Sequence, residues 1–193
     1  MIGVITYDVH HRKTQDVIFQ LLLNGYSELH LIVIPWVKRK NYVPIFEHRP
    51  TYSVPVEVED FCKFLDLEYT KVEVNEVEQL LLEKQFEHII IGGAGLLPDN
   101  LPKQFEIINA HPGYLPYVKG LDALKWAIYQ GQPIGVTTHY ISVSADEGRL
   151  IEKRIIPVYF EDTFHSVAYR VYETEIEMSV NAIKLIENNP QFI

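Results

Sequence analysis

The sequence predicts an α/β fold: one domain over residues 1–193, with an open, mostly parallel twisted sheet and helices on both faces. Two observations predict it. Short apolar runs alternate along the chain with stretches whose apolar residues recur at helical spacing, which is the order that gives a parallel sheet covered by helices. The chain has 193 residues, an ordinary length for a domain with a single core, and it shows no internal repeat or low-complexity segment.

Seven apolar runs predict the strands. The runs at 2–6, 29–34 and 87–91 are rich in isoleucine, valine and leucine, which is typical of strands buried on both faces of a parallel sheet. Pro35 stops the second run, because proline cannot donate to an inner strand ladder. The expected strands cover residues 2–6, 29–34, 69–74, 87–91, 105–109, 134–141 and 149–158.

Helical spacing and capping residues predict the helices. Thr14 is expected to cap a first helix that ends at Gly25, and Asn75, followed by Glu78 three residues later, is expected to open another. A long amphipathic helix is expected from about 163 to 188. The remaining helices are expected near 57–66 and along the face formed by Leu121, Leu124 and Ile128, closed by Gly131.

Residues 35–56 differ from the rest of the chain because they show no steady period. They carry the basic run Lys38-Arg39-Lys40 and the prolines Pro44, Pro50 and Pro55. This composition predicts a long loop, and long loops in compact domains are usually functional or mobile.

Composition restricts the function classes. The net charge of −9 argues against a protein that follows nucleic-acid phosphates, since such proteins usually present a basic face. No run approaches the length of a membrane span, and the N-terminus lacks the pattern of a signal peptide. The single cysteine, Cys62, lies among apolar residues and is interpreted as a core residue. A cytoplasmic protein with small-molecule partners, and neither nucleic-acid nor membrane partners, is expected.

Polar side chains gather where two expected strands end. Asn109 and His111 are two residues apart, so strand alternation puts them on the same side, and Pro112 ends the strand. Asp146 follows a later strand, after an excursion long enough to return to a neighbouring one. The carboxyl edge of an open α/β sheet is where ligands bind. We therefore expect an amide, an imidazole and a carboxylate to meet at this edge.

These three groups supply what acyl transfer to an amine needs. Asn109 and His111 can donate hydrogen bonds to a carbonyl oxygen that becomes negative, and Asp146 can orient the histidine or accept the amine proton. Two other interpretations stay open. The residues can be ordinary turn and hydrogen-bonding groups in a silent binding module, or a divalent metal can sit on His111, Asp146 and His139, although their spacing matches no compact ligand motif.

Four blocks in one order and spacing resemble the folate-dependent formyltransferase family, which includes glycinamide ribonucleotide transformylase, methionyl-tRNA formyltransferase and amino-sugar N-formyltransferases. The likeness is specific over about residues 92–158. It departs from the family where Gly113 stands for a frequent serine, Lys119 for a frequent arginine, and Glu147 for a frequent threonine or glycine. The blocks are Asn109-Ala110-His111-Pro112-Gly113-Tyr114-Leu115-Pro116, Lys119-Gly120-Leu121, Gly135-Val136-Thr137-Thr138-His139-Tyr140 and Asp146-Glu147-Gly148.

The resemblance implies a Rossmann-like formyltransferase fold and a role for each block. Asn109, His111 and Asp146 are implied to be catalytic, and 10-formyltetrahydrofolate is the implied co-substrate. Residues 1–92 would form the acceptor half, 93–158 the folate and catalytic half, and 159–193 a C-terminal helix. The pterin ring is implied to lie between two segments: Ala94, Gly95, Leu96 and Leu97, and Ile141, Ser142, Val143, Ser144 and Ala145. His139 is either a residue that supports Asp146 or a buried strand residue.

The acceptor amine must be inferred from the first half. The bulky turn after the first strand does not resemble the small-residue phosphate loop of glycinamide ribonucleotide transformylase, and no added tRNA-binding domain is recognised. An amino sugar or sugar nucleotide is therefore expected, with glycinamide ribonucleotide or a small amino-acid-type amine as the alternative. A homodimer is also considered. The expected substrate-binding residues are His10, His11, Arg12, Lys13 and Lys119, or the first four form only a solvated basic face.

Overall fold

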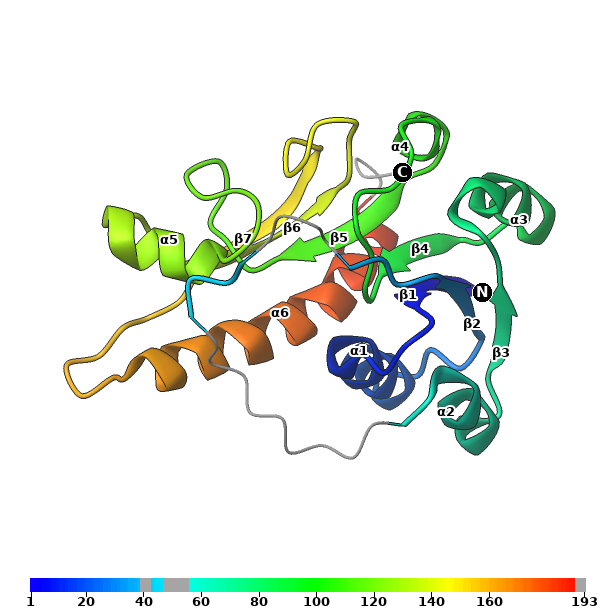
Figure 1. The fold of residues 1–193 in the computed structure, drawn as a ribbon, viewed down its shortest axis with the longest axis horizontal. Helices are drawn as coiled ribbons and strands as arrows, with labels where there is room; N and C mark the ends of the chain where they lie inside the picture. The colour runs from blue at the N-terminus through cyan, green and yellow to red at the C-terminus, as the bar shows by residue number, and fades with distance from the viewer. Residues whose placement is uncertain (39–42, 47–55, 190–193) are drawn as a thin grey trace. The chain divides into compact units, whose positions relative to one another are not determined.

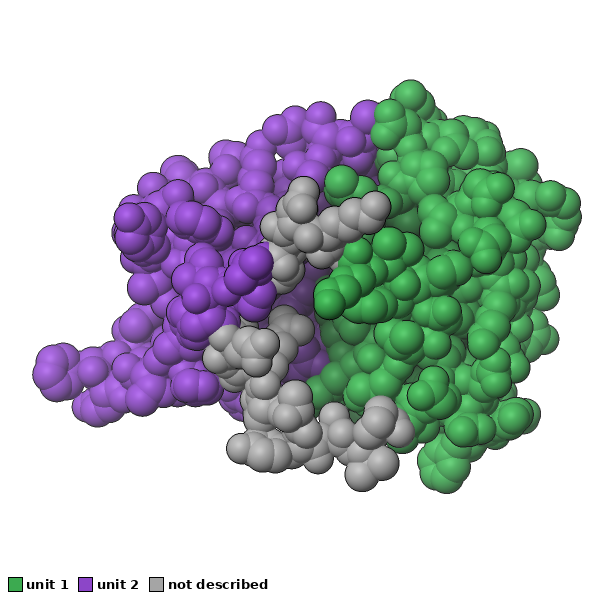
Figure 2. Space-filling view, viewed as in Figure 1, with its two compact units in different colours: residues 1–39, 51–108 green, residues 40–50, 109–193 purple. Residues whose placement is uncertain are grey.

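A computed structural model of the chain describes residues 1–38, 43–46 and 56–189. Its contacts divide the chain into two compact units, shown in Figure 2. Unit 1 comprises residues 1–39 and 51–108, and unit 2 comprises residues 40–50 and 109–193. The expected single domain, with its boundaries at 92 and 158, stays a prediction. Arg39, Lys40, Pro50 and Pro55 of the expected loop lie outside the described residues.

The strands of the described chain form a seven-stranded sheet in the order β3-β2-β1-β4-β5-β6-β7. The pairs β1–β2, β1–β4, β2–β3 and β4–β5 are parallel, and β6–β7 is antiparallel. The predicted α/β class with a mostly parallel sheet is confirmed. The strands are β1 (Ile2–Tyr7), β2 (Leu29–Ile34), β3 (Glu68–Lys71), β4 (His88–Ile91), β5 (Ile107–His111), β6 (Gly135–Tyr140) and β7 (Leu150–Ile155).

Unit 1 is built around the apolar strands β1, β2 and β4. Ile5 of β1 lies between Ile32 and Ile91 of the neighbouring strands, and all three side chains are buried. Helices α1 and α2 lie on one side of these strands and α3 on the other (Figure 1), as right-handed crossovers require when the chain reverses direction across a sheet. The helices of this unit are α1 (Arg12–Leu23), α2 (Val58–Leu65), η1 (Val74–Glu76), α3 (Val77–Lys84) and α4 (Asn100–Gln104).

Two expected caps in unit 1 are wrong. Helix α1 begins at Arg12, so Thr14 lies inside its first turn, where its hydroxyl is 2.7 Å from Thr6 Oγ1 in a buried hydrogen bond. The helical turn near Asn75 begins at Val74 in a capping box made by Glu73 and Glu76. Here the Glu73 amide donates to Glu76 Oε2 at 3.0 Å and the Glu73 carboxylate accepts the Glu76 amide hydrogen, so these two glutamates form the cap in place of Asn75 and Glu78.

Unit 2 packs helix α6 (Phe164–Glu187) against β6 and β7. Val136 of β6 and Val167, Val171 and Met178 of α6 belong to one buried cluster, which confirms the expected apolar stripe of this helix. Thr163 caps α6 by accepting the Ser166 amide hydrogen at 3.2 Å. Across the described residues, the structure contains no helix long and apolar enough to cross a membrane.

The expected face of helix α5 (Ala123–Gln130) is confirmed only for Leu124, which packs against the core of unit 2, and Gly131 ends the helix as expected. Leu121 and Ile128 are exposed, whereas Ala123, Ala127 and Lys125 are buried. Lys125 can be buried because Nζ lies 2.8 Å from Asp122 Oδ1 and donates to the Phe46 carbonyl oxygen at 2.5 Å. A buried charge needs such partners, and helical spacing of apolar residues does not reveal them.

Candidate active site

Strand β5 carries the first two residues of the candidate site. It runs from Ile107 to His111, two residues later than expected, so Asn109 and His111 belong to the strand itself. Ala110 between them is buried and makes the strand's other face. Asn109 and His111 contact the same group of polar residues, as the alternation of side chains predicted.

The ring of His111 is fixed by one backbone carbonyl. Its Nε2 lies 3.0 Å from the Val118 oxygen, which can only accept, so Nε2 carries a hydrogen. Nδ1 then faces Asp146, at 3.6 Å from Oδ1. That separation is longer than a hydrogen bond, and it becomes an ion pair when His111 is protonated at Nδ1. The backbone therefore decides which ring nitrogen faces the carboxylate.

His139 on β6 is buried beside this pair and orients Asn109. Its Nδ1 lies 2.9 Å from the Tyr140 carbonyl oxygen and donates to it, which leaves Nε2 as an acceptor in the neutral ring. The Asn109 amide nitrogen lies 3.4 Å from this Nε2. The His139 pKa lies below its ordinary value, chiefly because burial disfavours the charged ring.

The 3.8 Å approach of His139 Nε2 to Asp146 Oδ1 is consequently not an ion pair at neutral pH. The charge of Asp146 raises the His139 pKa, but burial has the larger effect. A neutral His139 accepts from the Asn109 amide and so fixes which end of that amide carries the hydrogens. One Nδ2 hydrogen points to His139 and the other stays available for a reacting oxygen.

Asp146 is held from outside its own loop. The backbone amide of Gly120 donates to Asp146 Oδ2 at 2.7 Å, so Oδ1 is the oxygen that faces the two histidines. Asp146 has a φ of 55°, in the left-handed region that few non-glycine residues adopt. Such a conformation persists where the surroundings determine it, and it is concentrated at functional sites.

The loop after β5 brings these partners into place. Thr137 of β6 accepts the Leu115 amide hydrogen at 3.1 Å and donates to the Gly113 carbonyl oxygen at 2.8 Å. Gly113 is needed because a Cβ there would lie 2.5 Å from His111 Nε2 and 2.7 Å from the Val118 oxygen. A serine, frequent at this position in the resembled family, does not fit this tight loop.

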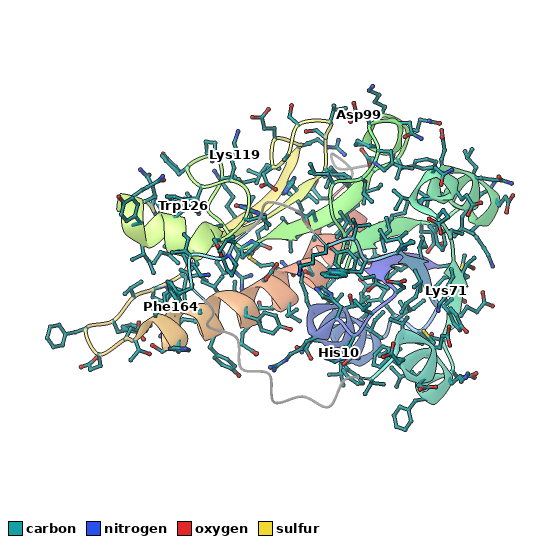
Figure 3. The ribbon with its side chains drawn as sticks, in the orientation of Figure 1. His10, Lys71, Asp99, Lys119, Trp126 and Phe164 are labelled. Atoms are coloured by element: carbon teal, nitrogen blue, oxygen red, sulfur yellow. The ribbon has the colours of Figure 1, made fainter. Side chains whose placement is uncertain are left out.

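Lys119, expected to bind substrate, is labelled in Figure 3 and forms an ion pair with another residue of unit 2. Its Nζ lies 2.6 Å from Glu147 Oε1, and both side chains are partly exposed. The pKa of Glu147 is lowered, first by the hydrogen bond from Lys119 and then by its charge. The two loops that carry Val118 and Asp146 are thus linked by a charged pair.

The two expected folate segments belong to different units. Leu96, in the segment after β4 in unit 1, is 84% exposed, so its side chain is not part of the core. In unit 2, Val143 is half exposed in the loop that leads to Asp146, and Ser142 Oγ donates to the Ser144 carbonyl oxygen at 2.8 Å. Folate binding by both segments stays a prediction.

The other expected substrate residues lie around the start of α1 in unit 1. Arg12 and Lys13 form the first turn of the helix, rather than preceding it as expected. His11 Nδ1 lies 2.9 Å from Thr14 Oγ1, and His10 Nδ1 accepts the Val56 amide hydrogen at 3.2 Å. Substrate binding by these residues stays a prediction, and Figure 3 labels His10.

Sequence reasoning left the role of His139 open and missed Thr137. The signal for both is the block Gly135–Tyr140, in which three consecutive polar residues, Thr137, Thr138 and His139, stand in an expected inner strand and are buried. The Val118 carbonyl and the Gly120 amide were also missed, because every residue has such groups and no sequence pattern marks them.

The described residues hold no group of three His, Cys, Asp or Glu side chains suited to a metal ion. Cys62 is buried, which raises its pKa to about 11, as expected of a core thiol rather than a nucleophile.

Comparisons with known proteins agree on the family. The chain is 31% identical over 111 residues to phosphoribosylglycinamide formyltransferase of Bacillus subtilis (strain 168), covering 56% of this chain and 57% of that protein. It is 29% identical over 144 residues to methionyl-tRNA formyltransferase of Desulforamulus reducens, covering 72% of this chain and 42% of that protein. The match thus spans about half the length of these curated relatives.

A solved structure and a family model extend the likeness to most of the chain. The structure of a sugar N-formyltransferase from Shewanella sp. FDAARGOS_354 superposes with a TM-score of 0.65 at 19% identity, covering 97% of this chain and 71% of that one. At that identity the superposition shows the fold alone. The model of the formyl transferase family matches residues 24–183. The chain belongs to the formyl transferase family.

Proposed function

We propose that this protein transfers a formyl group from 10-formyltetrahydrofolate to a primary amine, with Asn109, His111 and Asp146 as its catalytic residues. The observation that carries the proposal is the cluster in unit 2, in which the imidazole of His111 faces Asp146 at 3.6 Å and His139 orients Asn109. Membership of the formyl transferase family supports the reaction class.

Each of the three side chains has a part in the reaction. The amine nitrogen attacks the formyl carbon, the carbonyl oxygen becomes negative, and the bond from that carbon to the folate nitrogen breaks. The second Nδ2 hydrogen of Asn109 and the Nδ1 hydrogen of a protonated His111, whose Nε2 hydrogen is bound to Val118, are donors for the negative oxygen. Asp146 stabilises the charged His111 and accepts the amine proton, directly or through water, and that proton passes on to the folate nitrogen as its bond to the carbon breaks and the carbonyl re-forms.

The residues near Asp146 suit a reduced folate. The loop of residues 141–145 presents the half-exposed Val143 between two serines, an apolar contact flanked by hydroxyls that suits one face and edge of a flat heterocycle. When bound, 10-formyltetrahydrofolate supplies the activated formyl carbon. We include Ala94, Gly95, Leu96 and Leu97 in the proposal on the strength of the sequence resemblance.

An amino sugar or a sugar nucleotide is the acceptor we favour. The turn between β1 and α1 is filled by side chains bonded within unit 1, since Asp8 accepts the Trp36 amide hydrogen at 2.7 Å and His10 accepts that of Val56. These contacts support the interpretation that this turn differs from the small-residue phosphate loop that a ribonucleotide acceptor needs. Arg12, in the first turn of α1, is 63% exposed and lies 3.3 Å from Asp16 Oδ2, a partner that it would exchange for an anionic group of the substrate.

Turnover with a panel of amines tests the proposal. Purified protein is incubated with 10-formyltetrahydrofolate and amino sugars, nucleotide-linked amino sugars, glycinamide ribonucleotide or amino acids, and release of tetrahydrofolate is followed. Thermal-shift measurements with the same amines identify the acceptor through its stabilising effect. The protein is expected to act on at least one amino sugar, and absence of turnover with every amine, despite folate binding, would favour a silent binding module.

Two variants test the catalytic residues. Asn109→Ala and Asp146→Asn are each expected to lower kcat by about 10²- to 10³-fold. Asp146→Asn is the better matched change, because asparagine tolerates a φ of 55° and its side-chain oxygen can still accept the Gly120 amide hydrogen. Near-full activity of both variants would show that the proposed mechanism is wrong.

A further inference from the structure

We propose that Lys119 and Glu147 are positioning residues: their ion pair holds the loop after β5 against Asp146 and so sets the geometry between Asp146 and His111. Lys119 lies in the loop that leads to α5 (Figure 3), and its Nζ is 2.6 Å from Glu147 Oε1. The catalytic consequence rests on the proposed formyl transfer, whereas the effect on loop geometry does not.

Two neighbouring residues of one loop contact two neighbouring residues of the other. Lys119 binds Glu147, and the next residue, Gly120, donates its amide hydrogen to Asp146 Oδ2 at 2.7 Å. Adjacent Cα atoms are about 3.8 Å apart and joined by a planar peptide, so a backbone displacement at Lys119 or Glu147 is passed on to Gly120 or Asp146. Loss of the ion pair therefore loosens the hydrogen bond that fixes the catalytic carboxylate.

Asp146 needs this external support. It has a φ of 55°, and Gly120, on the other side of the contact, has a φ of 77°. A left-handed aspartate is maintained by its surroundings rather than by its own preference. With Oδ2 bound to Gly120, Oδ1 faces His111 at 3.6 Å, and a rotation of the carboxylate would change that distance directly.

The charges of the pair are favourable but accessible to solvent. The Lys119 and Glu147 side chains are 38% and 50% exposed, so salt screens their attraction and its effect on rate is modest. Ser144, in the same loop as Glu147, also forms a hydrogen bond with that carboxylate. Glu147 is thereby tied to the loop that we propose contacts the folate.

The alternative is that Lys119 binds an anionic group of the substrate, and the two roles have opposite kinetic signatures. If Lys119 binds substrate, Glu147 competes for it, so Glu147→Gln lowers KM while Lys119→Met raises it. If the pair positions Asp146, both variants lower kcat by a similar factor and leave KM unchanged. The exchanged double variant, with Lys119→Glu and Glu147→Lys, then restores kcat.

The Gly120 amide gives a readout that does not depend on turnover. A backbone amide bound to a carboxylate has a downfield proton resonance and exchanges slowly with water, so both single variants are expected to shift the Gly120 resonance upfield and speed its exchange. The exchanged variant is expected to restore both. The control is the Lys71–Glu59 pair of unit 1, labelled at Lys71 in Figure 3 and of similar exposure. Lys71→Met and Glu59→Gln should leave the Gly120 resonance unchanged.

The kinetic arm uses the amine that supports turnover. Lys119→Met and Glu147→Gln are expected to lower kcat by roughly two- to fivefold, the size of a partly exposed ion pair. An unmoved Gly120 amide, an unchanged kcat, or opposite changes in KM would each overturn the positioning role. If the wild-type protein formylates no amine, the proposed function fails, and the Gly120 resonance still decides whether the pair holds the loop.

Discussion

Replacing Gly113 by alanine tests whether the tight loop after β5 fixes His111, the histidine that we propose is catalytic. The new Cβ would lie 2.5 Å from His111 Nε2 and 2.7 Å from the Val118 oxygen, the two atoms of the hydrogen bond that sets the ring. Ordinary contact begins at 3.4 Å, so the ring must move away by about 0.9 Å. Moving a catalytic group by about 1 Å can cost on the order of 10²-fold in rate.

The same substitution also has a stability cost. Extra volume in a packed region costs about 1–3 kcal/mol, and the loss of a neutral hydrogen bond adds about 1 kcal/mol. Activity is therefore measured per folded molecule, with kcat taken from initial rates and the free energy of unfolding from urea titration. Gly3→Ala, whose Cβ would press on the Phe86 ring in unit 1 at 3.0 Å, controls for crowding alone and should keep kcat. A Gly113→Ala protein with wild-type kcat would refute the proposed fixing of His111.

Two further predictions concern stability. Thr138 has a buried hydroxyl with no hydrogen-bond partner among the described residues, so Thr138→Val should raise the free energy of unfolding by about 1 kcal/mol, whereas Thr137→Val, which removes two hydrogen bonds, should lower it. An unchanged melting temperature for both would contradict this. Burial lowers the pKa of His30 and His139 below 6.5, so the unfolded chain binds more protons and stability falls as pH drops below about 6.5. The free energy of unfolding, measured with urea between about pH 7.5 and 5.5, should fall less steeply with decreasing pH in His30→Gln than in the wild-type protein. An equal pH dependence in the two proteins would exclude His30 as a cause.

The mostly parallel sheet could be predicted because its strands β1, β2 and β4 are mainly apolar segments, and such short apolar segments are typical of buried strands. Helix starts were less predictable, since tertiary contacts compete with local capping. Thr14 has the residue type of a cap, but its hydroxyl is used in a buried hydrogen bond with Thr6. The buried Lys125 shows the same limit, because its charge is tolerated only through Asp122 and Phe46, and Phe46 is distant in sequence.

In the candidate site, the side chains could be predicted from the sequence, whereas the backbone groups that orient them could not. Asn109, His111 and Asp146 could be identified from residue type, strand alternation and the family resemblance. The groups that orient two of them are the Val118 carbonyl, which holds His111, and the Gly120 amide, which holds Asp146. These belong to one loop, two residues apart, so a single loop conformation sets both ends of the His111–Asp146 contact.

This arrangement explains why side chains in the loop can differ from the family pattern without loss of the site. What the site needs from residues 112–120 is a backbone path, and different residues can stabilise the same path. Here the path is held by the hydroxyl of Thr137, by the missing side chain of Gly113 and, in our proposal, by the Lys119–Glu147 pair. In this proposal the residues at positions 113, 119 and 147, which depart from the family pattern, act together to stabilise one backbone conformation of the loop. A change at one of these positions alone should be more harmful than concerted changes that preserve the backbone path.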